Sequence, residues 1–175
     1  MHRYVALLRA VNVGGTGKLP MAELKAMCED AGFQNVRTYI ASGNVVFEST
    51  HAEATLKQTL EERLQRYAGK PVGVLVRTGE ELARVLAANP FADEPGNRVV
   101  AIFLDAAPAK SALDDISGLK DERLALGRRE IYVHYGDGMA DSRLKIKAAT
   151  QGTARNMNTV AKLAAMAAAG SAGDV

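Results

Sequence analysis

The sequence has few of the residues that commonly mark a redox or metal centre. Its 175 residues include one cysteine, three histidines and no tryptophan. A lone cysteine, Cys28, excludes an intramolecular disulfide bond and a zinc site built from several thiolates. His2, His51 and His134 are far apart in the chain and do not have the spacing of metal ligands. We therefore expect no metal ion and no cofactor.

Long hydrophobic runs and aromatic clusters are also missing. No apolar run approaches the ~18 residues that a membrane-spanning helix needs, and the first residues do not have the layout of a signal peptide. Aromatic side chains make up only 5% of the chain, which leaves little surface on which nucleic-acid bases could stack. We expect a cytoplasmic protein with no membrane partner.

The formal net charge of +2 conceals an uneven distribution of charge along the chain. The segment from Ser142 to Gly173 has no acidic residue, and its basic residues are Arg143, Lys145, Lys147, Arg155 and Lys162. A basic C-terminal segment on a nearly neutral body suits the binding of an anion. A solvated helix face explains the same charges without any ligand.

Hydrophobic periodicity predicts a first half over residues 1–77. The expected elements are a strand, a helix, two strands, a helix and a strand, over residues 3–13, 20–31, 36–41, 45–47, 51–68 and 72–76. Thr50 is expected to cap the second of these helices, with Glu53 at capping-box spacing. The order βαββαβ is that of a ferredoxin-like split βαβ unit.

A second half is predicted over residues 78–175. A helix, a strand and a two-stranded hairpin are expected over residues 80–88, 98–104, 123–126 and 131–135, and Thr78 can cap the helix. From residue 139 the chain is predicted to be helical to its end, with Thr153 as a cap. The predicted fold class is α+β, with two packed ferredoxin-like halves.

The N-terminal run carries the first candidate site. Arg9 lies in the predicted strand 3–13, and Gly14, Gly15 and Lys18 follow in a glycine-rich loop. A guanidinium among apolar residues needs an internal carboxylate or an anionic ligand as its partner. The sequence does not match the phosphate loop of NTPases, because Asn12 and Leu19 stand where that motif needs Gly and Ser or Thr. A simple flexible connection between strand and helix is the alternative.

Two further groups of polar residues are candidates. Ser42-Gly43-Asn44 can hydrogen-bond a ligand, although a turn closed by its own side chains is the stronger interpretation of the tripeptide alone. Arg155 and Asn156 are predicted in the first turn of a helix, with Thr159 on the same polar stripe. Cations are usually disfavoured at a helix start, so their presence there indicates a nearby anion.

These segments resemble a bacterial family of unknown function called DUF1697. The resemblance lies in residues 7–15, 21–24, 38–47, 89–91, 103–104, 131–132 and 155–160. Met157 departs from the family pattern, which often has Trp there, and Arg143 stands where Lys is usual. The resemblance implies an α+β fold of ferredoxin-like parts and no particular activity. The family's motif residues correspond here to Arg9, Asn12, Gly14, Gly15, Ser42, Gly43, Asn44, Arg155, Asn156 and Thr159.

Our first hypothesis is a protein, with or without enzymatic activity, that binds a small phosphorylated, carboxylated or nucleotide-like ligand. Arg9, Lys18 and Arg155 would converge on one pocket and neutralise the anion, while the side chains of residues 42, 44 and 156 would orient it. On this hypothesis Arg155→Ala weakens binding and leaves the melting temperature nearly unchanged. A nucleic-acid-binding module using the basic tail is the second hypothesis. A purely structural role, in which the arginines pair with internal carboxylates such as Glu23, is the third. The sequence specifies neither a reaction nor an oligomeric state.

Overall fold

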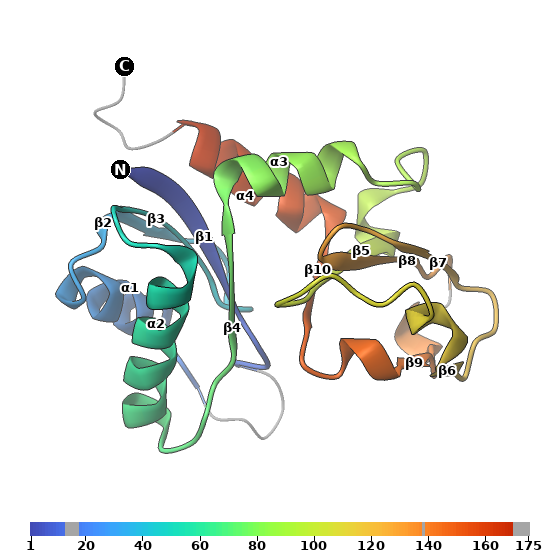
Figure 1. The fold of residues 1–175 in the computed structure, drawn as a ribbon, viewed down its shortest axis with the longest axis horizontal. Coiled ribbons are helices and arrows are strands. Elements are labelled where there is room, and N and C mark those ends of the chain that lie inside the picture. Colours follow the sequence, from blue (N-terminus) through green and yellow to red (C-terminus); the bar gives the residue numbers. More distant parts are fainter. Residues whose placement is uncertain (13–17, 138, 170–175) are drawn as a thin grey trace. The chain divides into compact units, whose positions relative to one another are not determined.

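The computed structural model describes residues 1–12, 18–137 and 139–169 (Figure 1). The chain divides into two compact units, one formed by Met1–Leu82 with Lys162–Val175, the other by Ala83–Ala161. None of the helices in the described ranges has the length and apolar character that crossing a bilayer requires.

The first unit is built on a four-stranded antiparallel sheet. Its elements are β1, α1, β2, β3, α2 and β4, over His2–Leu8, Met21–Asp30, Gln34–Thr38, Asn44–Ser49, Glu53–Ala68 and Val74–Thr78. The strands lie in the order β2-β3-β1-β4, and every neighbouring pair is antiparallel. The element order predicted from the sequence is confirmed, with strand ends that differ by a few residues.

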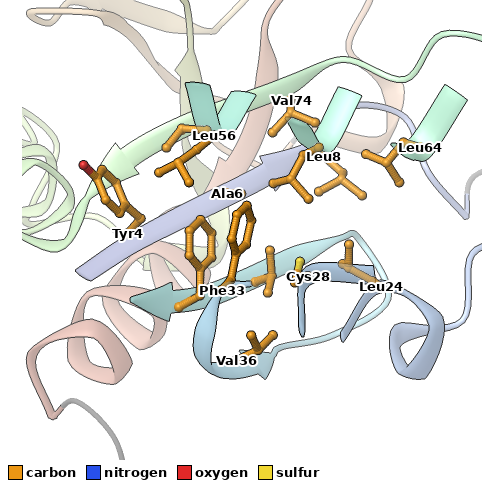
Figure 2. Packing of buried hydrophobic residues seen from close by; sticks show 14 of the residues in the cluster. Tyr4, Ala6, Leu8, Leu24, Cys28, Phe33, Val36, Leu56, Leu64 and Val74 are labelled. Atoms are coloured by element: carbon orange, nitrogen blue, oxygen red, sulfur yellow. The ribbon is translucent and has the colours of Figure 1, made fainter. Parts of the chain in front are cut away.

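One face of this sheet carries the core of the first unit, and both helices cover it. Alternate residues of β1, Tyr4, Ala6 and Leu8, point into the core together with Cys28 of α1 and Leu64 of α2 (Figure 2). The spacing of two residues along a strand and of three or four along a helix brings these side chains to a common interface. All five are at most 5% exposed, so the helices close this face.

The opposite face of the same sheet is also buried. Val5 and Leu7 of β1 are 0% exposed, which explains why the strand reads as a continuous apolar run and not as an alternating one. Arg77, the residue of β4 that pairs with Val5, is only 1% exposed, and its guanidinium donates to the carbonyl of Val76 at 3.0 Å. A buried arginine at this position was not predicted from the sequence.

Helix starts in this unit test the predicted caps. α3 spans Gly79–Ala87, and Thr78 and Glu81 form a reciprocal capping box with N···O distances of 3.1 and 3.0 Å. This confirms the predicted role of Thr78. The predicted cap at Thr50 is wrong, because α2 begins at Glu53 and Ala52 occupies its N-cap position.

The second unit contains a four-stranded antiparallel sheet with shorter strands. The strands lie in the order β10-β5-β8-β7, over Thr153–Asn156, Val99–Phe103, Glu130–His134 and Arg123–Leu126. A two-stranded sheet pairs β6, Ile116–Ser117, with β9, Lys145–Ile146. Short 3₁₀ turns, η1 to η4, occupy Gly96–Arg98, Ala112–Asp114, Met139–Asp141 and Lys147–Ala149. The predicted hairpin of β7 and β8 is confirmed.

The predicted continuous helix from residue 139 onward is wrong. The chain forms η3, β9, η4 and β10 before the last helix, α4, begins at Met157 and runs to Ala169. Thr153 does not cap this helix, since it lies in β10 opposite Phe103. Thr153 and Arg155 are buried and Ala154 is exposed, which is the two-residue period of a strand. Pairing with β5 therefore overrides the helical pattern of the following residues.

The end of the C-terminal helix belongs to the first unit. Residues from Lys162 onward group with the first unit instead of the second. The reason lies at the end of α4, where Arg37 donates to the carbonyl of Met166 at 2.7 Å and Arg3 to that of Ala168 at 3.1 Å. The last carbonyls of a helix lack intrahelical partners, and α4 has no basic residue in its own last turn. Two arginines of the first unit supply the donors.

Candidate functional site

A cavity of about 360 Å³ lies within the first unit. Three segments line it: residues 9–11 after β1, residues 18–19 before α1, and residues 64–73 between the end of α2 and β4, of which Leu64, Tyr67, Ala68, Lys70, Pro71, Val72 and Gly73 contribute. The segments are far apart in the sequence. The sheet brings them together, because the end of β1 pairs with the beginning of β4.

Arg9 is positioned by this strand pairing. β1 ends at Leu8, opposite Val74, so Arg9 follows the strand and does not lie within it as predicted. Its backbone N–H donates to the carbonyl of Gly73 at 2.9 Å. A Cβ added to Gly73 would lie 3.6 Å from both Cβ and Cδ of Arg9, so the aliphatic part of the arginine packs along the glycine.

The wall of the cavity carries positive charge. Arg9, Lys18 and Lys70 all contribute to it, and no aspartate or glutamate belongs to its described lining. Lys18 and Lys70 are exposed, and within residues 1–12, 18–137 and 139–169 neither pairs with an acidic side chain. A lining that holds three cations and, among the described residues, no carboxylate favours a negatively charged ligand.

The side chain of Asn12 is held by backbone groups of two other segments. Its amide oxygen accepts from the N–H of Leu19 at 2.6 Å, and its amide nitrogen donates to the carbonyls of Leu19 at 2.9 Å and Ala41 at 2.7 Å. Both polar atoms of the side chain are thus engaged with the backbone. Asn12 therefore fixes the position of Leu19, and with it that of the preceding Lys18. The bond to Ala41 connects this segment to the turn after β2.

The backbone around this end of the sheet is conformationally unusual. Ala10, Asn12 and Ile40 have φ values of 55°, 56° and 51°, in the left-handed region that residues with a side chain seldom adopt. For a β-branched residue such as Ile40 the conformation is costly. Strained residues of this kind occur most often at functional sites, where the surrounding structure holds them in place.

The tripeptide Ser42-Gly43-Asn44 forms the turn between β2 and β3. Asn44 is fully buried and donates to the carbonyl of Tyr39 at 2.8 Å and to the hydroxyl of Ser42 at 2.9 Å. Gly43 has φ of 89°, and a Cβ there would lie 2.6 Å from Cγ2 of Val11. The tripeptide closes its own turn, and its side chains are not in the cavity wall.

The other predicted site residues belong to the second unit. Arg155 is 7% exposed, and its guanidinium donates to the hydroxyl of Thr153 at 2.7 Å and to the carbonyl of Ala154 at 3.0 Å. Burial lowers the pKa of Arg155 to about 10. Arg155 and Asn156 end β10 and precede α4, so the predicted first helical turn at these residues is wrong. Asn156 caps α4 by accepting from the N–H of Thr159 at 2.9 Å, and Thr159 is buried.

The predicted residues thus divide between the units. Arg9, Lys18 and Asn12 lie together in the first unit, and Arg155, Asn156 and Thr159 in the second. Gly14 and Gly15 lie outside the described residues. Convergence of Arg9 and Arg155 on one pocket stays a prediction.

Lys70 and Tyr67 are the cavity residues that sequence reasoning missed. The predicted helix ends at residue 68, and Gly69 does end α2, with φ of 73°. No role beyond this helix end is predicted for Lys70. The signal that could have found them was the predicted βαββαβ order. In a split βαβ sheet the first and last strands are antiparallel neighbours, so the loop after one lies beside the loop before the other.

Comparison with known proteins places the chain in a family. A family model described as "Protein of unknown function (DUF1697)" matches residues 1–132. A solved structure, that of a conserved bacterial protein from Streptococcus pneumoniae, is similar with a TM-score of 0.79 and 25% sequence identity, over 95% of this chain and 98% of that one. A search among curated proteins found no match. The matched region covers the whole cavity and most of both units, and the chain therefore belongs to the DUF1697 family.

Proposed function

We propose that this protein binds a small anionic ligand, phosphorylated or carboxylated, in the cavity between the ends of β1 and α2. The observation that carries the proposal is the composition of the wall, in which Arg9, Lys18 and Lys70 face a space of about 360 Å³ without an acidic residue among its described lining. Charge-assisted hydrogen bonds from such groups are the strong ones in ligand recognition. The positioned Arg9 supplies a planar donor set, and the two lysines supply mobile point charges.

In this proposal the residues around the cavity have different roles. Arg9, Lys18 and Lys70 contact the anion, whereas Asn12, Ser42 and Asn44 hold the backbone that presents them. The frame is of the ferredoxin-like kind, an assignment supported by the element order and the strand order β2-β3-β1-β4.

A structural role for the lysines is the competing explanation. α2 ends at Ala68, beside Lys70, and cations near the last turn of a helix offset the negative end of its dipole. That explanation concerns stability and requires no ligand. If the lysines bind a ligand, removing their charge lowers the affinity for an anion. If they only stabilise the helix, removing their charge lowers the melting temperature instead.

The test compares two double variants, each of which loses two lysine charges: one at the cavity and one in the second unit. In Lys18→Ala/Lys70→Ala both changed side chains are exposed cavity residues. The matched control, Lys145→Ala/Lys147→Ala, changes two exposed lysines of the second unit and lowers the net charge equally. Pyrophosphate is titrated into each protein, with binding followed by calorimetry and by the backbone amide shifts of residues 9 and 73.

We expect the cavity variant to bind pyrophosphate about tenfold more weakly than the wild type, since each exposed charge contributes about 1 kcal/mol or less. The control should bind as the wild type does. Equal affinities of the two variants would overturn the proposal. A lower melting temperature of the cavity variant with unchanged binding would support the structural explanation.

A further inference from the structure

We propose that the ligand of this cavity carries a planar ring beside its anionic group, as a nucleoside monophosphate does, and that the ring stacks on Tyr67. This inference rests on the proposed function, because it concerns the same cavity. It adds the chemical class of the ligand and one specificity-determining residue.

The cavity is larger than a bare anion needs, and part of its wall is apolar. Cavities of about 300–1,000 Å³ hold ligands of the size of a mononucleotide. Besides its three cations, the wall presents apolar surface from Ala68, Pro71 and Val72, none of which is buried. Inorganic phosphate would leave this apolar surface in contact with water, whereas a ring would cover it.

Tyr67 is distinguished from every other aromatic residue of this chain. All nine aromatic residues fall within the described ranges, and among them Tyr67 is the exposed one, at 47%. Tyr4 and Phe33 instead each stack on Phe47 inside the core. Within the described part of the chain, no ring or cation stacks on Tyr67. An exposed ring on the wall of a cavity can stack on a ligand at little cost in side-chain entropy.

The helix that carries Tyr67 also fixes its position. Tyr67 follows Leu64 by three residues on α2, and Leu64 is anchored in the core at 1% exposure (Figure 2). Residues three apart lie on neighbouring positions of a helix surface. The aromatic side chain therefore stands next to the buried stripe of α2, on the same wall as Lys70. Ring and charge are presented together, as recognition of a phosphorylated nucleoside requires.

The experiment separates the ring from the phosphate. Ribose phosphate, adenosine and the monophosphates of adenosine, guanosine, cytidine and uridine are titrated into the wild type and into Tyr67→Leu, Tyr67→Phe and the Lys18→Ala/Lys70→Ala variant. Tyr67→Leu keeps an apolar side chain without a ring, and Tyr67→Phe keeps the ring. The proton shifts of the ligand's base report stacking directly.

We expect at least one nucleoside monophosphate to bind the wild type about tenfold more tightly than ribose phosphate, with upfield shifts of its base protons. Tyr67→Leu should lose that advantage and the shifts, while its affinity for ribose phosphate stays unchanged; Tyr67→Phe should keep both. Equal affinities of the wild type for ribose phosphate and all four monophosphates, or an unaltered Tyr67→Leu protein, would overturn this inference alone. If the lysine variant bound every phosphorylated compound as the wild type does, the proposed function itself would fail.

Discussion

The two units each contain a cavity lined by lysines, and the cavities differ in how their charge is balanced. In the second unit Lys145, Lys147 and Asp115 line a cavity of about 520 Å³, and the ammonium of Lys147 lies 3.6 Å from a carboxylate oxygen of Asp115. In the first unit the cavity wall holds three cations and no carboxylate in its described lining. A lysine that is paired with a carboxylate of the same protein attracts an external anion less strongly. The pairing of the cations therefore indicates an anion site better than their number does.

The two candidate arginines differ in their burial. Arg9 is half-buried at the edge of a cavity, with its stem along Gly73. Arg155 is buried within β10 and bonded to Thr153 and Ala154. The two guanidinium groups are chemically the same, and they differ in their access to solvent. Arg9 is therefore suited to contact a ligand, whereas Arg155 supports the sheet.

The largest expected effect concerns the turn that supports the first cavity. Gly43→Ala places a Cβ 2.6 Å from Val11 and 2.9 Å from Leu8 in a left-handed conformation. Strain and overpacking together should lower the free energy of unfolding by about 3 kcal/mol or more. Gly32→Ala is the matched control, because Gly32 has φ of 91° with no atom within 4 Å of the added Cβ. Its cost should be about 1 kcal/mol. Urea unfolding measures both, and equal costs would show that the contact with Val11 is relieved easily.

The next effect distinguishes the two arginines. Arg155→Ala should lower the free energy of unfolding by about 2 kcal/mol, since it leaves a gap and removes a donor from the hydroxyl of Thr153. Arg155→Met, which refills the space without a charge, should cost less than about 1 kcal/mol.

Pyrophosphate binding should be unchanged in both Arg155 variants. The sequence alone predicted that Arg155→Ala weakens binding and leaves the melting temperature nearly unchanged. We now expect the opposite, because Arg155 is buried. If Arg155→Ala bound pyrophosphate more weakly and kept its stability, the sequence-based prediction would be correct.

The effect that is smallest near neutral pH, and that grows only in alkaline solution, uses a thiol as a reporter of the first unit. Burial raises the pKa of Cys28 from its ordinary value of 9.0 to about 12. In the unfolded chain the thiol ionises at lower pH than in the folded chain, which favours unfolding. Its contribution to stability is therefore complete below about pH 9 and is lost as the pH rises toward 12, by roughly 1.4 kcal/mol for each pH unit.

The measurement is the difference in unfolding free energy between the wild type and Cys28→Ala as the pH is raised above neutrality. Taking the difference removes the contributions of tyrosines such as Tyr132, whose pKa burial also raises to about 12. A difference independent of pH would mean that the thiol is less protected from solvent than its burial indicates.

The order of elements in the first unit was predictable because each element has a strong local pattern. Leu56, Leu60 and Leu64 share a helix face, and the capping box of Thr78 and Glu81 is readable from their spacing. The strand 3–13 was predicted too long because Ala10 and Val11 are apolar, although Ala10 already has a positive φ. A hydrophobic pattern cannot indicate a left-handed backbone in a residue other than glycine.

The candidate site was predictable only in part. Arg9 and Lys18 were found because they flank a glycine-rich loop. Lys70 and Tyr67 were missed, since their place in the cavity depends on the pairing of β1 with β4, a contact between distant parts of the chain. The strand at Thr153 was missed for a similar reason: its hydrogen-bonding partner, β5, lies about fifty residues earlier in the sequence.

The bonds from Arg3 and Arg37 to the carbonyls of α4 have a consequence for biosynthesis. The unit that contains β1 also contains the chain from Lys162 onward, so it is discontinuous in sequence. On the ribosome the sheet emerges early, whereas the helix end that these arginines bind emerges more than a hundred residues later. The final contacts of the first unit in a nascent chain therefore form only after α4 has emerged, and a messenger truncated near codon 161 would leave this unit permanently incomplete.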